Sequence, residues 1–102
     1  MSAMTKSLHD DLFDLVSSVQ SSNDAKKLLI DLLSPAEIEY VAQRWQIMQQ
    51  VAAGHSHRSI AKAVGTSIAK VSRCAQVVHH GNGAVLHWMR RLGKPIKMAR
   101  KS

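Results

Sequence analysis

The clearest absence in this 102-residue chain is that of acidic side chains beyond residue 39. All seven Asp and Glu residues lie between Asp10 and Glu39, and together with three lysines they leave residues 1–39 with a net charge of −4. Residues 40–102 carry eleven Lys and Arg residues and no acid, which makes this part +11. Such a positive field favours a polyanionic partner, with nucleic acid as the first candidate and a generically basic domain as the alternative.

Other absences exclude whole classes of protein. A single cysteine, Cys74, rules out a disulfide framework and fits a reducing compartment, so a cytoplasmic protein is expected. No apolar run approaches the roughly 18 residues of a membrane span, and no signal peptide is visible. The basic part holds neither paired carboxylates nor a glycine-rich phosphate loop. The histidine pairs of this part have spacings that match no closed zinc site. We therefore predict a protein that is not an enzyme and that holds neither a metal nor a cofactor.

The N-terminal third of the chain is predicted to form two helices. Apolar residues at helical spacing indicate a helix from about residue 6 to residue 19, followed by a polar, turn-like segment at residues 21–24. The next helix is short and very apolar over Leu28–Leu33, and we expect it to be buried, between subunits. A chain of this length has little core volume of its own, so a homodimer that shares its core is expected.

A long third helix has the best-defined start. Ser34-Pro35-Ala36-Glu37 combines an N-cap serine, a proline at the first helical position and the glutamate of a capping box. The helix is expected to reach Ala53 and to end at Gly54. Its predicted core-facing stripe is Ile38, Val41, Trp45, Met48 and Ala52.

The C-terminal part is expected to begin with a loop at residues 79–83. An amphipathic helix over residues 83–92 follows. Residues 93–102 are basic and contain a proline, and we expect a mobile tail that adds nonspecific affinity for DNA. No strand pattern and no repeat occurs in the sequence, so the predicted fold class is all-α.

Two short helices over residues 57–78 have helix-turn-helix spacing, with a break at Gly65 and with Thr66 or Ser67 as the cap of the second helix. Ala61 provides the small residue needed where two steeply crossed helices touch, and Gly65 permits the positive φ of the tight turn. The apolar wedge between the helices is expected to consist of Ile60, Val64, Ile68 and Val71, with Cys74 as a small core residue.

The second of these helices turns short polar and cationic side chains outward, which suits base edges and phosphates in a DNA major groove. We expect Arg58, Ser67 and Lys70 mainly to contact the DNA backbone, so that neutralising Lys70 lowers the salt dependence of binding by about one unit. The side chains expected nearest the bases are Ile68, Ala69 and Ser72. The complete set of predicted DNA-contacting residues is His57, Arg58, Lys62, Thr66, Ser67, Ile68, Ala69, Lys70, Ser72 and Arg73.

Four stretches match the motifs of one family: Leu33-Ser34-Pro35-Ala36-Glu37, Ala42-Gln43-Arg44, Ile60-Ala61-Lys62 through Gly65, and Ser67-Ile68-Ala69-Lys70-Val71-Ser72-Arg73. Over residues 33–92 the chain thus resembles the tryptophan-repressor superfamily. The resemblance implies an intertwined all-α homodimer of about six helices, with a single domain over residues 1–92. In that layout residues 6–53 form the dimerisation helices, residues 57–78 the helix-turn-helix and residues 83–92 the last helix.

In the tryptophan-responsive branch of this superfamily two arginines sandwich the indole of a corepressor, and they match Arg44 and Arg73. The resemblance implies a small aromatic corepressor such as L-tryptophan, held by Leu33, Ser34, Arg44, Arg73 and Val77. Planar guanidinium groups stack on aromatic rings and pair with carboxylates, which suits this ligand. Cys74 and Val77 stand where that branch has glycine and serine, and the stretch over residues 54–65 is one residue shorter.

The shorter spacing, together with Ala42-Gln43-Arg44, Val71-Ser72-Arg73 and Gly81-Asn82, resembles instead the YerC/YecD branch, for which we name no corepressor. The leading hypothesis is a sequence-specific DNA-binding transcriptional repressor controlled by a small aromatic corepressor. Its expected partners are operator DNA and a second copy of the chain. The alternatives are the same regulator without tryptophan control, and a helix-turn-helix module that binds protein or RNA.

Overall fold

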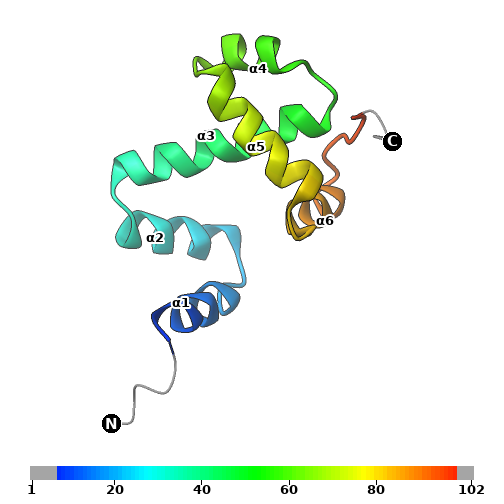
Figure 1. Ribbon diagram of the computed structural model, residues 1–102. Helices are drawn as coiled ribbons and strands as arrows, with labels where there is room; N and C mark the ends of the chain where they lie inside the picture. The colour runs from blue at the N-terminus through cyan, green and yellow to red at the C-terminus, as the bar shows by residue number, and fades with distance from the viewer. Residues whose placement is uncertain (1–6, 99–102) are drawn as a thin grey trace. The chain divides into compact units, whose positions relative to one another are not determined.

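The computed structural model describes residues 7–98, which form six α-helices and no strand (Figure 1). The helices are α1 (Leu8–Ser17), α2 (Ser22–Leu32), α3 (Pro35–Ala52), α4 (His57–Val64), α5 (Ile68–His80) and α6 (Ala84–Arg91). The chain divides into two compact units, an N-terminal unit ending at Ile38 and a C-terminal unit beginning at Glu39, so the boundary falls within α3. The predicted all-α fold class is confirmed. Within the described range, no helix has both the length and the apolar character needed to cross a bilayer.

Serine caps explain where most of the helices begin. A serine hydroxyl before the first turn accepts a hydrogen bond from the backbone N–H three residues on, which satisfies one of the free donors of a helix start. Bonds of this kind, 3.0–3.1 Å long, occur at Ser7, Ser21, Ser34, Ser56 and Ser67. At Ser34 the bond is reciprocated, because Glu37 Oε1 accepts a hydrogen bond from the Ser34 N–H at 2.8 Å. The capping box predicted for the third helix is therefore confirmed.

The structure corrects the predicted turn at residues 21–24. These residues form the cap and first turn of α2, because the Ser21 hydroxyl accepts from the N–H of Asp24. The Asp24 carboxylate also lies in the first turn, at the positive end of the helix dipole. A polar serine and aspartate cluster of this kind suits a helix start as well as a turn, and here it starts the helix.

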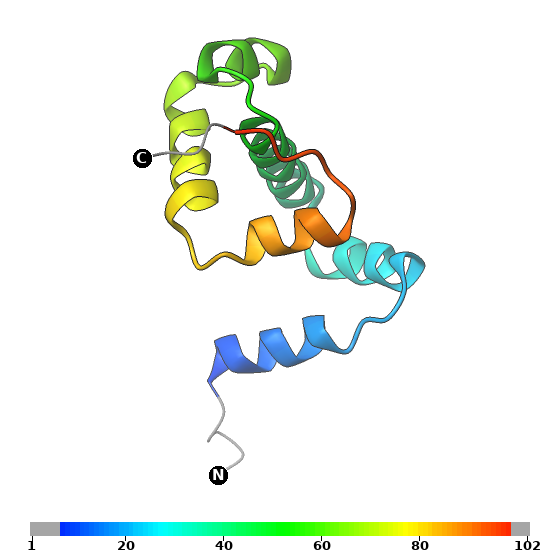
Figure 2. The ribbon, with the colours of Figure 1, turned by 90° about the vertical axis from the view of Figure 1, so that its right-hand side faces the viewer.

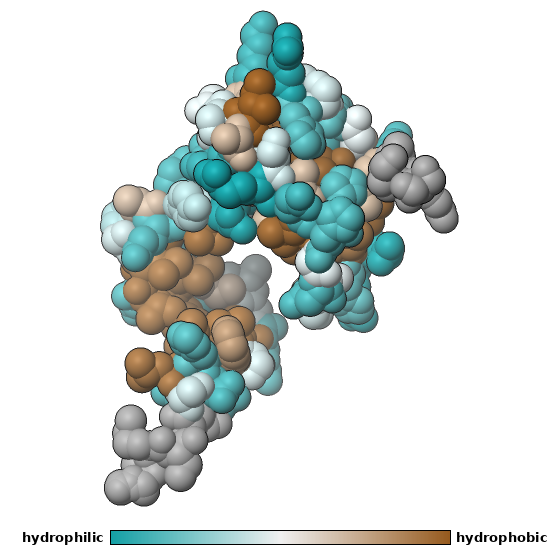
Figure 3. Space-filling view, viewed as in Figure 1, coloured by the Kyte–Doolittle hydropathy of each residue, from teal (hydrophilic) through white to brown (hydrophobic). Residues whose placement is uncertain are grey.

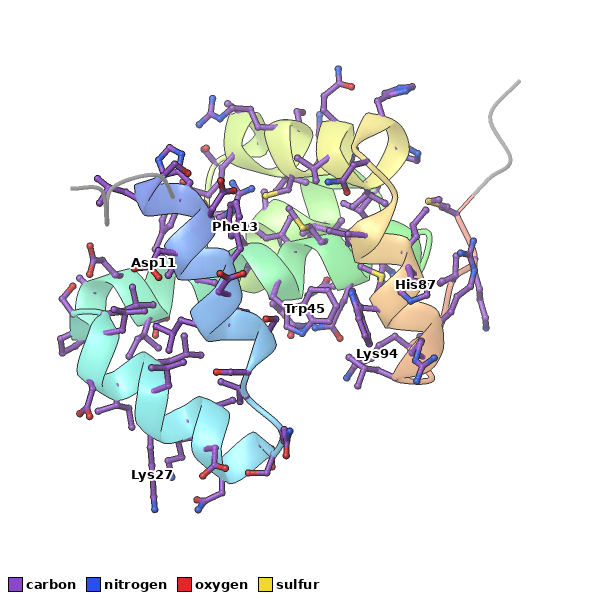
Figure 4. The ribbon with its side chains drawn as sticks, turned by 90° about the horizontal axis from the view of Figure 1, so that it is seen from below. Asp11, Phe13, Lys27, Trp45, His87 and Lys94 are labelled. Carbon is purple, nitrogen blue, oxygen red and sulfur yellow. The ribbon has the colours of Figure 1, made fainter. Side chains whose placement is uncertain are left out.

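No residue of α1 or α2 is buried in the single chain. The burial predicted for Leu28–Leu33 does not occur within the chain, since Ile30 is 56% exposed. Figure 3 shows the apolar surface that results over α1 and α2, whereas Lys27 extends away from α2 in Figure 4. The exposed apolar side chains of the two helices are Leu8, Leu12, Phe13, Leu15, Val16, Leu29, Ile30 and Leu32. The two helices also border an open apolar groove of about 240 Å³, lined by Val16, Val19, Ala25, Leu28 and Leu29.

The hydrophobic core of the described residues lies in the C-terminal unit. Its buried residues are Ile47, Met48, Val51, Ala52, Ile60, Ala61, Val71, Cys74, Ala75, Val78 and Met89. Four of these belong to α5, which packs against both α4 and α6. The stripe predicted for α3 is partly wrong: Met48 and Ala52 are buried, but Val41 is 54% exposed and Ile47 is buried instead. Burial on α3 is confined to the end of the helix that joins the core, where Trp45, which projects from α3 in Figure 4, also packs.

The segment after α6 does not behave as the mobile tail predicted over residues 93–102. Residues 94–98 run back along the C-terminal end of α3 (Figure 2), and we call them the C-terminal strap. The backbone N–H groups of Lys97 and Met98 both donate to the carbonyl oxygen of Ala52, at 2.6 and 2.8 Å. Two apolar side chains of the strap pack against the core, which explains its order. The rest of the predicted tail lies outside the described residues.

The loop predicted at residues 79–83 begins later than expected. Both of its histidines belong to the last turn of α5, where basic side chains suit the negative end of the helix dipole. The N–H of Gly81 donates to the carbonyl oxygen of Val77 at 2.9 Å, and a Cβ at Gly81 would lie 2.5 Å from the same oxygen. The N–H of Ala84 donates to Asn82 Oδ1 at 3.0 Å, which begins α6.

Candidate nucleic-acid interface

Helices α4 and α5 with the turn between them form the helix-turn-helix predicted over residues 57–78, with α5 two residues longer. Gly65 ends α4 in the left-handed conformation at φ 82°, and its N–H donates to the carbonyl oxygen of Ala61 at 2.9 Å. A Cβ at Gly65 would meet no heavy atom within 4 Å, so glycine is needed for its backbone conformation and not for space. Of the two predicted caps of α5, Ser67 makes the capping bond.

The contact between the two helices is close to the predicted wedge. Ile60 and Val71 are fully buried, and Ala61, which is 7% exposed, provides the small side chain at the contact. Cys74 is buried as predicted. Ile68 is 49% exposed, so its predicted place in the wedge is wrong. It is the first residue of α5 and precedes the part of the helix that joins the core.

Most of the predicted DNA-contacting side chains are open to solvent. The exposed ones are His57, Arg58, Lys62, Ser67, Ile68, Ala69 and Arg73. The half-buried ones are Thr66, Lys70 and Ser72. Ser72 Oγ lies 3.3 Å from His57 Nδ1, which joins the outward face of α5 to the start of α4. This contact brings polar side chains of the two helices together, so that one ligand can reach both.

The charges of this face favour an anion. The start of α5 carries the positive end of its helix dipole and backbone N–H groups that suit phosphate oxygens. Arg58 and Lys62 on α4 and Arg73 on α5 are exposed cations of the same unit. Because the sequence contains no acid beyond Glu39, nothing in the chain after that residue compensates them.

The ammonium group of Lys70 is held by side chains of α3. Its Nζ donates to Gln43 Oε1 at 3.2 Å and lies 4.8 Å from the centre of the Tyr40 ring. Arg44 Cζ lies 6.0 Å from the centre of the same ring. Both cations are thus within the distance at which an aromatic face attracts them. We call Tyr40, Gln43 and Lys70 the Lys70 clamp.

Sequence reasoning did not identify Tyr40, and it used Gln43 only as part of a family motif. The spacing of four residues between Tyr40 and Arg44 is a local signal, because side chains at this spacing meet on a helix. The contact of Lys70 with Gln43 spans 27 residues and has no local signal. The clamp is therefore visible only in the folded chain.

The residues predicted to hold a corepressor lie in different environments. Leu33 and Ser34 belong to the N-terminal unit, where Leu33 is half-buried and the Ser34 hydroxyl makes the capping bond. Arg44 belongs to the C-terminal unit and is half-buried, with its guanidinium facing an aromatic ring of its own helix. Arg73 is exposed, and Val77 is 37% exposed. Ser34 and Arg44 therefore already have partners within the chain.

An open groove of about 380 Å³ lies between α3 and α4, and none of the predicted corepressor residues lines it. Its lining residues are Glu39, Ala42, Gln43, Gln46, Gln50, Ala63 and Val64.

For the part of the chain that the structure describes, no three His, Cys, Asp or Glu side chains are grouped so that they could hold a metal ion. The rings of His79 and His80 lie 6.1 Å apart.

Known proteins resemble this chain in sequence and in fold. Residues 7–93 match the sequence family of the Trp repressor protein. The uncharacterized protein YerC of Bacillus subtilis (strain 168) is 28% identical over 75 residues, which are 74% of this chain and 72% of YerC. Two crystal structures match with a TM-score of 0.81 and 23% identity over 95% of this chain. They are a candidate Trp repressor from Staphylococcus aureus, covered to 99%, and a TrpR-like protein from Eubacterium eligens ATCC 27750, covered to 100%. The predicted superfamily and its fold are thereby confirmed.

Proposed function

Because the chain belongs to the Trp repressor protein family, we propose that it is a sequence-specific DNA-binding transcriptional repressor. The observation that carries this proposal is the exposed face of α4 and α5, which joins the positive start of α5 to exposed cations. In this proposal the exposed side chains of Arg58 and Lys62 contact phosphates, and the small side chain of Ala69 lets α5 approach base edges closely. The family and its fold are regulatory and not enzymatic, so we propose no catalytic role. We place this activity in the cytoplasm, because the free thiol of Cys74 suits a reducing compartment.

The test begins with selection of binding sites from a random duplex library by the full chain. We expect one enriched sequence with two half-sites about one helical turn apart, bound at least ~10³-fold more tightly than random DNA at the same salt. Ala69→Leu is expected to change the preferred sequence, because the proposal puts this exposed residue next to the bases. A library that yields no enriched sequence would rule out the repressor proposal.

Phosphate contacts are tested by the salt dependence of operator affinity, measured by fluorescence anisotropy. Lys62→Met removes one phosphate contact from each protomer of the proposed dimer, so it is expected to lower the slope of log affinity against log salt by about 1.8, with the sequence preference unchanged. Lys27→Met removes the same charge from an exposed position on α2 and serves as the matched control. Equal slopes for the parent and for Lys62→Met would exclude a phosphate contact by this lysine.

We propose further that the active form is a homodimer. This proposal is supported by the apolar side chains of α1 and α2, which no part of the single chain buries. Apolar surface of this extent normally marks a contact with another protein. A dimer would also supply two recognition helices for two half-sites. Sedimentation at micromolar concentration should give twice the chain mass of 11.2 kDa, and a mass of one chain would refute the proposal.

Control by tryptophan was the leading hypothesis from the sequence, and the contacts of the chain favour its alternative. We propose DNA binding without tryptophan control, because Arg44 already faces an aromatic ring and the Ser34 hydroxyl already makes a capping bond. Val77 offers an apolar side chain where the tryptophan-responsive branch has a serine.

Calorimetry with L-tryptophan, with and without operator DNA, tests this form of the proposal. We expect no binding heat and no change in operator affinity. If tryptophan does act, it must raise operator affinity and the operator must raise tryptophan affinity by the same factor. Such reciprocal gains, abolished by Arg44→Ala, would establish tryptophan control instead.

A further inference from the structure

The first turn of α5 is tied to α3 by the Lys70 clamp. We infer that Tyr40 and Gln43 position α5 on DNA through Lys70, which acts as a positioning residue and not as a phosphate contact. The inference rests on the proposed function, because it concerns the same helix-turn-helix. It changes the role expected of Lys70 from the sequence, where it was placed on the DNA backbone.

Both the backbone and the side chain of Lys70 are held. Its backbone N–H donates to Ser67 Oγ at 3.0 Å, which fixes the residue within the first turn of α5. Its Nζ donates to Gln43 Oε1 at 3.2 Å and lies 4.8 Å from the centre of the Tyr40 ring. One residue thus connects the capped start of α5 directly to α3.

This connection matters because only the last residue of the first turn of α5, Val71, belongs to the core. Ile68 is 49% exposed and Ala69 is exposed, whereas the first fully buried residue of the helix is Val71. The end of the first turn is held by the burial of Val71, while the exposed beginning of the turn is held by the Ser67 cap and by the contacts of Lys70. In a helix-turn-helix, the N-terminal residues of the second helix contact the base edges, so a small change in direction alters those contacts.

The partners of Lys70 also determine what its charge does. The ammonium group already has a carbonyl acceptor and an aromatic face, and a phosphate contact would require it to leave both. Lys62 on α4 is exposed and has its charge open to solvent. The two lysines of the helix-turn-helix are thus expected to differ in their roles. Replacing Lys62 should remove a contact with a DNA phosphate, while replacing Lys70 should remove a contact that positions α5.

The clamp is tested first in the free protein by NMR. The ring current of Tyr40 should move the ε-methylene protons of Lys70 upfield from the position found for the exposed Lys62. Tyr40→Phe keeps the ring and should keep this shift, whereas Tyr40→Leu should abolish it. An unshifted Lys70 in the parent protein would overturn the clamp, whether or not the protein binds DNA.

The positioning role is tested by operator affinity over a series of salt concentrations, without any added small molecule. Tyr40→Leu and Lys70→Met should each weaken operator binding by about 5- to 30-fold, which corresponds to the loss of one exposed cation–π contact in each protomer of the dimer. The variant with both substitutions should lose no more operator affinity than Lys70→Met alone, because the two substitutions remove the same contact between Tyr40 and Lys70. The salt slope should stay at the parent value in all three, while Lys62→Met should lower it by about 1.8, which is about 0.9 for each protomer of the dimer.

Two outcomes would overturn the positioning role. A salt slope lowered by about 1.8 in Lys70→Met, as in Lys62→Met, would make Lys70 a phosphate contact. Unchanged operator affinity in Tyr40→Leu would show that the ring does not position α5. Thermal unfolding of each variant monitors folding, and recovery of parent affinity in Tyr40→Phe separates the role of the ring from a general loss of stability.

The two experiments distinguish a failure of the proposed repressor function from a failure of the Lys70 clamp. If the parent protein selects no DNA sequence, the repressor proposal and the positioning role fail together, while the NMR shifts still show whether the clamp exists. If the parent selects an operator but Lys70 is unshifted, the proposed function stands and the clamp is wrong.

Discussion

The two units of this chain use their apolar residues in opposite ways. The C-terminal unit buries eleven residues from α3 to α6 in one cluster, whereas α1 and α2 bury none. The difference does not lie in the quality of the helices, because α1 and α2 begin with the same serine caps as α4 and α5. It lies in the number of elements that enclose the apolar faces. Two amphipathic helices cannot enclose a core by themselves, and their apolar faces are then available to a partner.

Charge follows the same division. The acids are concentrated in the N-terminal unit, and the sequence from Glu39 onward contains eleven basic residues and one acid. The unit with its own core therefore carries the charge expected of a nucleic-acid interface. The unit without a core carries the apolar surface expected of a protein interface. We therefore expect the proposed DNA contact in the C-terminal unit and the proposed dimer contact in the N-terminal unit.

The largest expected effect is that of a charge placed on the apolar face of α2. Ile30→Asp should convert the dimer to a single chain in sedimentation, because an unpaired carboxylate buried between subunits costs several kcal/mol. Lys27→Asp introduces the same carboxylate at an exposed position of the same helix and should leave the dimer intact. A dimer that survives Ile30→Asp would show that this face is not the interface.

Truncation inside the core of the C-terminal unit should have the next largest effect. Met89 is fully buried, and Met89→Ala should lower the free energy of unfolding by about 3 kcal/mol. Leu92, which is 61% exposed, provides the control. Leu92→Ala should change the free energy of unfolding by no more than about 0.5 kcal/mol. Denaturant unfolding at one fixed protein concentration measures both. Equal costs for the two variants would contradict the core described for this unit.

Alanine substitutions at two glycines test the C-terminal strap against the turn between α4 and α5. Gly54 and Gly65 both have positive φ, 94° and 82°, so alanine at either should cost about 1 kcal/mol in backbone conformation. A Cβ at Gly54 would also lie 3.2 Å from the carbonyl oxygen of Lys97 in the C-terminal strap, while a Cβ at Gly65 meets nothing within 4 Å. Gly54→Ala should therefore destabilise more than Gly65→Ala in thermal unfolding. The reverse order would argue against the strap.

The smallest expected effect is at the cap of α3. Ser34→Ala should lower the free energy of unfolding by about 1 kcal/mol, because the N–H of Glu37 loses its acceptor. Ser34→Asp keeps an acceptor and should stay within a few tenths of a kcal/mol of the parent. Chemical denaturation of the three proteins is the measurement. If Ser34→Asp is as unstable as Ser34→Ala, the hydroxyl has a role other than capping.

Helix starts were the most predictable part of the fold. The capping box at Ser34, the left-handed turn at Gly65 and the bounds of α4 all follow from residues within one helical turn of one another. The start of α2 at Ser22 was missed for the same local reason, because the polar residues 21–24 suit a turn as well as a cap. Most of the residues predicted to contact DNA are exposed, because the spacing of α4 and α5 decides which side chains point outward, and their contact with DNA stays a prediction.

The sequence by itself determined the all-α class, the capping box at Ser34, the helix-turn-helix and the separation of charge. Each of these depends on composition or on residues three to four positions apart, whose contacts form wherever the helix forms. Only the tertiary structure decided that Lys70 turns to Tyr40 and Gln43, and that the C-terminal strap bonds to Ala52. These contacts join segments far apart in the chain, so they exist only once packing of the core has brought the helices together, and no local pattern records them.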